Sequence, residues 1–454
     1  MVGNTYSMSE SDKPMKNILI TSSFGEIELP TEDIYNFINT CMIQKQENDN
    51  KVYTEMKNFF DDSRYETQFH AISPHESGAM LKCLFSVIDR DYKVVRTTDF
   101  HYKNQVEIPP SYHEFDFGHE KDSLMVKGYI FAEHPQWGKV IMHLSPFSDD
   151  FNIELEVFFN PQVTSFKKIW GDVEDYFVTQ GPLLKNKIDA KWKPINVSKR
   201  DWQSIVVSDD NKKLIDRHIV SFIEYIDEYK KRGLPTSRGV LITGPPGTGK
   251  TLCCETIMNL VDCTAIYVTS DTIEHTGQIK EIYELARKLS PTLVVIEDID
   301  TLGGLDRREK GNHPLLGEFL NCLSGVGGND GVITIATTNY PENLDLALAD
   351  RPGRFDLRIE FGLPDSNLRR YILEKYLEEV ESESIDLKRI VKGTEGMSGA
   401  YIREVIMVAY MISLENKSIV SQEILNEALD TVKKLKNNIS ISYGIRKPLE
   451  DIYS

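Results

Sequence analysis

The pattern G-x-x-x-x-G-K-T at residues 244–251 restricts the possible folds of this chain more than any other feature. An apolar, β-branched run at 239–243 precedes it, and a helix-like run at 252–261 follows it. A strand, a glycine-rich turn and a helix in this order form a loop whose backbone N–H groups wrap around phosphate oxygens. The start of the helix adds free N–H groups and the positive end of its dipole. The sequence therefore predicts a nucleotide-phosphate site at this turn.

Individual residues of the loop have expected parts in binding. Lys250 is expected to reach the β- and γ-phosphates, and Thr251 is expected to ligate Mg²⁺. The other residues of the motif that we expect around the nucleotide are Gly244, Pro245, Pro246, Gly247, Thr248, Gly249 and Leu252.

Composition limits the class of protein. The 454 residues exceed one ordinary core, and 40% hydrophobic with 27% charged residues suits a globular chain. No run approaches the roughly 20 apolar residues of a membrane helix. The six cysteines include no C-x-x-C pair, which favours a reduced, cytoplasmic setting without structural zinc. A net charge of −18 disfavours nucleic acid as a partner.

Residues 1–195 lack a nucleotide motif and are predicted to form an α+β domain with one antiparallel sheet. Residues 153–159 alternate apolar and polar side chains, which is typical of a half-buried strand. The turn expected at 135–138 joins two further strands. The strand-like runs of this part lie at 80–88, 123–131, 139–144 and 153–159.

The rest of the chain alternates apolar β-runs with helical patterns and then becomes helical. The expected fold class is therefore α/β, a P-loop parallel sheet with helices on both faces and a small helical lid. The linker with its first helix, the large α/β subdomain, the helical lid and the tail are expected at 196–237, 238–363, 364–436 and 437–454. Strands are expected at 239–243, 264–268, 293–297 and 332–336, and helices at 212–231, 278–289, 366–379, 386–392, 399–415 and 421–436.

Two acids, Glu297 and Asp298, end an apolar strand about fifty residues after the phosphate loop. The carboxyl edge of a parallel sheet would place them beside that loop. We expect Glu297 to hold Mg²⁺ and Asp298 to activate the attacking water. Taken alone, the pair could equally be a solvated strand end.

Asn339 follows another apolar strand and is a candidate for orienting the attacking water and sensing the γ-phosphate. A strand-end turn residue is the alternative, because Asn is common in turns.

Arg351 and Arg354 flank a Pro-Gly turn. A guanidinium inserted at a transferred phosphoryl group raises its rate by about 10³–10⁵. At an edge of the molecule these side chains would serve a neighbouring subunit, which implies a closed ring of head-to-tail contacts. A salt bridge to Asp350 or Asp356 is the alternative for one of them.

Together these motifs resemble the AAA branch of ring ATPases over about residues 200–435. The resemblance implies ATP hydrolysis with Mg²⁺ in a homo-oligomeric ring, with a hexamer as the expected size. The residues that it places around the adenine and ribose are Ile205, Val206, Ser398, Gly399 and Ala400.

The order Glu297-Asp298 and the runs at 204–207 and 230–239 resemble one clade more narrowly, that of the mitochondrial AAA ATPase that translocates the folded Rieske iron–sulfur protein. We expect a bacterial-like relative without a membrane span, whose N-terminal domain binds a protein client. Threading members of the wider family carry an aromatic and an apolar residue where this chain has His275 and Thr276.

The leading hypothesis is an ATP hydrolase that remodels or chaperones a protein client. One alternative is a threading unfoldase that serves a separate protease. Another is a nucleic-acid remodelling ATPase, which the excess of acidic residues disfavours. The last alternative, an inactive nucleotide-gated scaffold, is disfavoured by Lys250, Asp298 and the two arginines.

Overall fold

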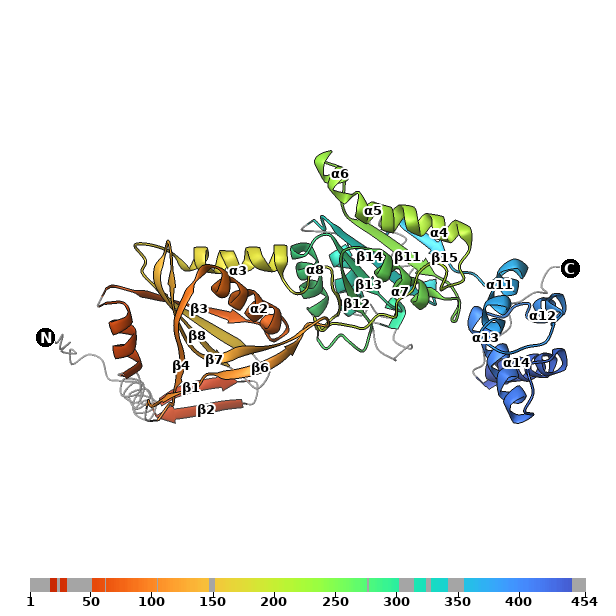
Figure 1. The fold of residues 1–454 in the computed structure, drawn as a ribbon, viewed down its shortest axis with the longest axis horizontal. Helices are drawn as coiled ribbons and strands as arrows, with labels where there is room; N and C mark the ends of the chain where they lie inside the picture. The colour runs from red at the N-terminus through yellow and green to blue at the C-terminus, as the bar shows by residue number, and fades with distance from the viewer. Residues whose placement is uncertain are drawn as a thin grey trace. The chain divides into compact units, whose positions relative to one another are not determined.

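The computed structural model describes residues 17–22, 25–30, 51–61, 63–103, 105–146, 152–275, 277–301, 314–323, 328–341 and 355–442. The chain divides into two compact units (Figure 1). Unit 1 comprises Met1–Phe115 and Ser123–Tyr176, and unit 2 comprises Asp116–Asp122 and Phe177–Ser454. Each unit has a β-sheet of its own, so each is described separately.

Unit 1 is built on a seven-stranded sheet in the order β3-β9-β8-β7-β4-β5, with β6 paired to β7. Its strands are β3 (Glu66–Ile72), β4 (Lys93–Phe100), β5 (Glu107–Ile108), β6 (Ser111–Asp116), β7 (Lys121–His134), β8 (Gly138–Pro146) and β9 (Ile153–Phe159). In the β7–β8 hairpin His134 pairs with Gly138, which confirms the expected turn and its two strands. A separate hairpin joins β1 (Asn17–Ser22) to β2 (Gly25–Pro30).

Helices cover the sheet of unit 1. They are α2 (Pro74–Asp91), α3 (Phe166–Gln180) and a helix over residues 51–59. The run at 80–88 lies inside α2, so the expectation of a strand there is wrong. Its buried residues, among them Leu81, Leu84 and Ile88, recur at the spacing of one helix face, and the Ser73 side chain caps the helix start by accepting a hydrogen bond from the backbone N–H of Glu76.

Unit 2 contains a six-stranded sheet whose pairs are all parallel, in the order β10-β12-β13-β14-β11-β15. The strands are β10 (Lys187–Asp189), β11 (Arg238–Thr243), β12 (Thr264–Val268), β13 (Thr292–Ile296), β14 (Val332–Thr338) and β15 (Leu357–Glu360). The four central strands confirm the predicted α/β fold class. The edge strands β10 and β15 were not predicted, and β10 falls within the 195 residues that the sequence assigns to the N-terminal domain.

Helices pack on both faces of this sheet, as a parallel arrangement requires. They are α4 (Asp209–Ile215), the π-helical turn η1 (Asp216–Val220), α5 (Ser221–Glu224), α6 (Ile226–Lys231), α7 (Lys250–Leu260), α8 (Gln278–Lys288), the short 3₁₀ turn η2 (Ile299–Thr301) and α9 (Pro314–Leu323). One core joins α4–α7 to sheet residues such as Val240, Leu293 and Ile333. On the opposite face Tyr283 of α8 is buried and bonds Thr334 of β14 at 2.9 Å.

The single helix expected at 212–231 is divided in the structure. It contains the π-helical turn and is interrupted at Tyr225, whose backbone leaves the helical region with φ −102° and ψ 15°. Its apolar residues are buried as predicted. The spacing of apolar residues indicates which face of a helix is buried. It does not indicate the backbone hydrogen-bonding pattern, so the interruption at Tyr225 could not be predicted from it.

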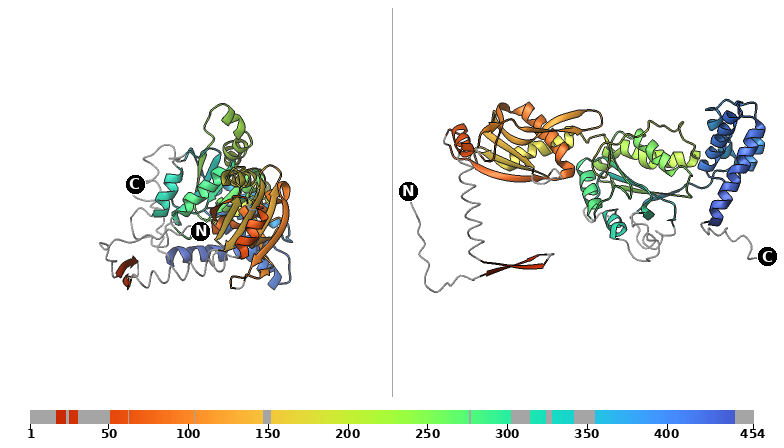
Figure 2. Two further views of the ribbon diagram at one scale, coloured as in Figure 1. Left: turned by 90° about the vertical axis from the view of Figure 1, so that its left-hand side faces the viewer. Right: turned by 90° about the horizontal axis from the view of Figure 1, so that it is seen from below.

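Four helices form the lid, namely α11 (Ser366–Leu377), α12 (Leu387–Gly393), α13 (Gly399–Glu415) and α14 (Gln422–Ser442). Figure 2 shows them gathered into one group. They share an apolar core that includes Leu373, Ile402 and Leu425. The lid expected from the sequence is confirmed, although α14 continues past residue 436. Residues 443–454 of the expected tail lie outside the described residues. None of the described helices combines the length and apolarity needed to cross a bilayer.

Candidate nucleotide site

The phosphate loop connects β11 to α7, as the motif predicts. Gly244, Gly247 and Gly249 adopt φ values of +152°, +77° and +97°, which side-chain-bearing residues rarely adopt. A Cβ at Gly244 would lie 2.1 Å from the carbonyl oxygen of Phe361. The Thr248 hydroxyl donates to the Pro245 carbonyl at 2.9 Å, which closes the loop on itself. The described loop geometry therefore requires glycine where the motif has it.

Lys250 is the first residue of α7, and only 6% of it is exposed. Its Nζ donates to the carbonyl oxygens of Gly244 at 2.7 Å and Pro245 at 3.0 Å, and to Oδ1 of Asn339 at 2.7 Å. Burial lowers the pKa of Lys250, and the nearby carboxylates of Asp298 and Asp300 oppose that shift. The lysine is thus a desolvated cation held at the mouth of the loop.

Glu297 directly follows β13. Its Oε2 accepts a hydrogen bond of 3.3 Å from the Thr251 hydroxyl. Its Oε1 is buried and has no hydrogen-bond partner within the described part of the chain. Burial raises the pKa of Glu297, while the hydroxyls of Tyr267 and Thr251 oppose the shift. An unpartnered carboxylate oxygen beside a hydroxyl is a donor set that suits Mg²⁺.

Asp298 has a positive φ of +45°, an uncommon conformation for a residue with a side chain. Its Oδ1 accepts a hydrogen bond of 2.9 Å from Nδ2 of Asn339. Burial raises the pKa of Asp298, the charge of Asp300 raises it further, and Lys250 opposes both. The structure therefore brings the predicted acid, amide and lysine into one connected group.

A cavity of about 700 Å³ lies over the phosphate loop in unit 2. It is lined by the loop from Pro246 to Leu252 and by Ile205, Val206, Asp298, Asn339, Gly399 and Ala400. The N–H of Ala400 donates to the Gly247 carbonyl at 3.1 Å, so the start of α13 contacts the loop directly. The remaining described residues that were predicted for the site, Gly244, Pro245, Glu297 and Ser398, are not among the residues that line this cavity.

Arg351 and Arg354, the predicted arginine pair, lie outside the described residues, so the structure does not place them. The sequence also missed several residues at the site. Thr337 accepts a hydrogen bond from the Asp298 N–H, Asp300 accepts one from the Asn339 N–H, and the Thr338 hydroxyl donates to Asp300. The cations of Arg200, Lys375 and Arg403 line the cavity. A signal for the first group was available, because Asp300 follows the acid pair and two threonines precede Asn339.

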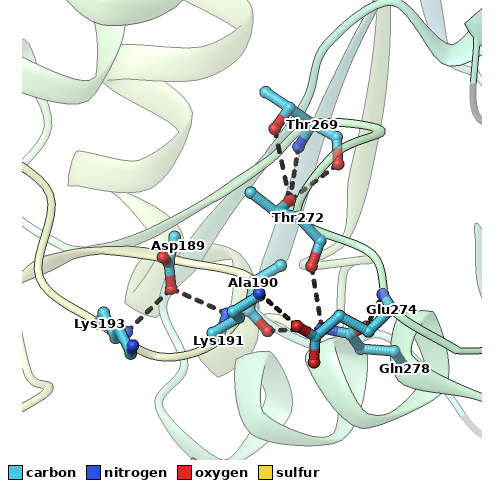
Figure 3. Close-up of polar contacts among 8 residues, drawn as sticks. All are labelled: Asp189, Ala190, Lys191, Lys193, Thr269, Thr272, Glu274 and Gln278. Carbon is cyan, nitrogen blue, oxygen red and sulfur yellow. Dashed lines mark hydrogen bonds and ion pairs between the residues drawn. The ribbon is translucent and has the colours of Figure 1, made fainter.

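The segment after β12 contains Glu274 and His275, and Thr276 lies outside the described residues. Figure 3 shows this segment tied to the turn after β10. The buried Gln278 side chain donates from Nε2 to the carbonyls of Ala190 at 3.1 Å and Thr272 at 3.3 Å, and its Oε1 accepts from the Glu274 N–H at 2.7 Å. Lys191 forms an ion pair with Glu274. Hydrogen bonds and an ion pair therefore hold this segment against its own subdomain.

The fold and the site define a P-loop nucleotide-binding domain with an attached helical lid. Residues 240–363 match the family model described as "ATPase family associated with various cellular activities (AAA)". This part of the chain is thus similar to the AAA ATPase domain, and the match covers nearly the whole predicted large subdomain.

Three curated relatives resemble the chain beyond that domain. The chain is 30% identical over 350 residues to "ATP-dependent zinc metalloprotease FtsH 2" of Methylacidiphilum infernorum, covering 72% of this chain and 52% of the relative. It is 34% identical over 254 residues to "ATP-dependent zinc metalloprotease FtsH" of Staphylococcus haemolyticus, covering 52% and 34%. It is 37% identical over 213 residues to a "Putative 26S proteasome regulatory subunit homolog" of Methanothermobacter marburgensis, covering 44% and 55%. The chain therefore spans between a third and about half of the length of these relatives.

Proposed function

We propose that this chain is a magnesium-dependent AAA ATPase that remodels or chaperones a protein client. One observation carries the proposal. The ends of β11, β13 and β14 bring Lys250, Asp298 and Asn339 into direct hydrogen-bonded contact at a cavity large enough for a nucleotide. The relatives of the AAA domain support ATP as the nucleotide.

Each residue of the site has its own part in ATP hydrolysis. Lys250 and the N–H groups of the loop bind the β- and γ-phosphates. Thr251 and Glu297 hold Mg²⁺, which neutralises phosphate charge when it is bound with ATP. Asp298 accepts the proton of the attacking water, and the Asn339 amide orients that water against the γ-phosphate.

The adenine and ribose occupy the other end of the cavity, between two separate segments of the chain. Ile205 and Val206 provide an apolar surface on one side. Ser398, Gly399 and Ala400 at the start of α13 lie on the other side, and the contact of Ala400 with Gly247 ties the lid to the phosphate loop. Movement of the lid would therefore accompany changes at the phosphates.

Arg351 and Arg354 complete the site of a neighbouring subunit in a homo-oligomeric ring, for which a hexamer is the expected size. Arg351→Ala is expected to lose ATP hydrolysis, since a trans-acting arginine contributes about 10³–10⁵ in rate. Mixing Arg351→Ala with inactive Asp298→Asn chains should restore part of it, because one kind of interface then contains both intact groups. Mixtures without any recovery would contradict a shared site.

In this proposal unit 1 binds the client in the cytoplasm, and we expect neither a nucleic-acid partner nor a membrane span. The acidic charge of −18 supports the exclusion of nucleic acid. Two observations support remodelling without threading. One is the resemblance to the Rieske-translocating clade, and the other is the set of hydrogen bonds that holds the segment around Glu274 in place. Asp298→Asn with ATP is expected to retain client from a lysate, whereas Lys250→Ala, which lacks ATP binding, is expected to release it.

A threading unfoldase that serves a protease is the second candidate, because the names of the relatives refer to a metalloprotease and a proteasome subunit. The H-E-x-x-H pattern of zinc proteases does not occur in the printed 454 residues. A fluorescent protein with a disordered tail distinguishes the candidates. A threading unfoldase would destroy its fluorescence in an ATP-dependent reaction, and the proposed function predicts that the fluorescence persists.

A further inference from the structure

We propose that the two consecutive threonines at the end of β14, Thr337 and Thr338, are positioning residues for ATP hydrolysis. The Asp300 carboxylate is the group through which Thr338 acts. This inference rests on the proposed ATP hydrolysis and adds residues that no sequence motif assigned. None of the three lines the nucleotide cavity, so they act through neighbouring groups.

Thr337 holds the backbone of Asp298, the proposed general base. Its Oγ1 accepts a hydrogen bond of 2.9 Å from the backbone N–H of Asp298. Asp298 has its uncommon φ of +45° at this point, and such backbone conformations persist where surrounding contacts determine them. Only 1% of Thr337 is exposed, so water cannot replace this contact readily. The Thr337 hydroxyl therefore fixes the direction from which the Asp298 carboxylate projects.

Thr338 and Asp300 fix the position of the Asn339 backbone. Oδ1 of Asp300 accepts hydrogen bonds from the Thr338 hydroxyl at 2.7 Å and from the Asn339 backbone N–H at 3.3 Å. The same hydroxyl accepts from the Tyr340 N–H at 3.0 Å. Thr338 is completely buried. One carboxylate and one hydroxyl thus fix the backbone from which the Asn339 amide extends.

The Asn339 side chain is then oriented at both of its ends. Its Nδ2 donates to Asp298, and its Oδ1 accepts from Lys250. Successive residues of a strand project to opposite sides, so Thr337 and Thr338 reach two different points of the turn after β13. Together they join the ends of β13 and β14, which carry the acid and the amide. Errors of about 1 Å in such groups can reduce a rate by about a hundredfold.

Two pairs of variants test the proposal. Thr338→Val and Asp300→Ala remove the contact, and each should lower kcat by about ten- to a hundredfold with the Kd for ATP nearly unchanged. The double variant should lose less than the product of the two single losses, because both single variants remove the hydrogen bond between Thr338 and Asp300. Thr338→Ser and Asp300→Asn preserve a donor and an acceptor and should recover most of the rate.

Additive losses in the double variant, or a serine variant as slow as the valine variant, would overturn the proposal. A readout without turnover separates this outcome from failure of the proposed function. Crystal structures of the wild type and Thr338→Val should show the Asn339 amide displaced from Asp298 in the variant, whether or not the wild type hydrolyses ATP. An Asn339 side chain in the same position in both structures would refute the inference by itself.

Discussion

The ammonium group of Lys250 donates a 2.7 Å hydrogen bond to Oδ1 of Asn339, which belongs to the end of a different strand. Two loop carbonyls accept its other hydrogen bonds. An ammonium has three donors, so protein oxygens engage all of them in this structure. A phosphate oxygen must replace at least one of these partners. Replacement of Oδ1 of Asn339 by a γ-phosphate oxygen would couple binding of that phosphate to the position of the Asn339 amide.

Lys250→Ala is expected to weaken ATP binding at least tenfold, because one hydrogen bond to a charged group contributes about 1.5–3 kcal/mol. Titration with a fluorescent ATP analogue measures the effect. Lys185→Ala is the matched control, since Lys185 is an exposed cation paired with Asp262 away from the cavity. An unchanged Kd for Lys250→Ala would show that the loop does not bind phosphate as proposed.

Glu297→Gln is expected to stabilise the protein at pH 7 without nucleotide or Mg²⁺. Burial raises the pKa of Glu297, so the folded state binds the proton more tightly than the unfolded chain. The ionised carboxylate then destabilises the fold, a cost that appears as pH rises past the usual Glu value and is complete above the raised pKa. The neutral amide removes this cost and can still accept from Thr251.

Thermal unfolding as a function of pH measures this effect. The gain in the melting temperature should shrink as pH falls and disappear below about pH 4, near the ordinary Glu pKa. The exposed Glu284→Gln variant on α8 serves as control and should show no such gain. A Glu297→Gln protein less stable than the wild type at pH 7 would indicate that the carboxylate stabilises the fold, contrary to the direction of its pKa shift.

Gln278→Leu is expected to destabilise unit 2. The substitution leaves the Glu274 N–H and the Ala190 carbonyl without the amide that now joins them. An unsatisfied buried polar group costs about 1–3 kcal/mol. Chemical denaturation, followed by the ATP-binding signal of unit 2, measures the change. Lys191→Ala removes the exposed ion pair to Glu274 and should have a much smaller effect, so equal losses in both variants would contradict the assigned importance of the buried amide.

The phosphate loop, the acid pair and Asn339 could be predicted because each follows an apolar strand of one parallel sheet. The carboxyl ends of such strands meet at one edge, so their order in the sequence determines which residues meet. The glycines of the loop are predictable for a similar reason, since their positive φ values leave little choice of residue. The positions of the phosphate loop, the acid pair and Asn339 depend on the order of the strands in the sheet, which the pattern of apolar runs in the sequence indicates.

The contacts of Asp300, Thr337 and Thr338 could not be predicted from the sequence, although these residues stand beside the acid pair and Asn339. Their contacts depend on the turn after β13, in which Asp298 takes a positive φ that no motif specifies. The strand β10 has three residues, too few to show a period. The run at 80–88 was misjudged from its β-branched and aromatic content, although the cap at Ser73 and the helical apolar spacing favour a helix.

The central claim is that Asp298 removes the proton of the water that attacks ATP. The most direct measurement compares the steady-state release of phosphate by wild type and Asp298→Asn with the Kd of each for ATP. The account predicts magnesium-dependent turnover by the wild type, a loss of about 10²–10⁴ in kcat for the variant, and similar Kd values for both. Turnover by Asp298→Asn at the wild-type rate would contradict the account, as would a wild-type protein that binds ATP with Mg²⁺ and leaves it intact.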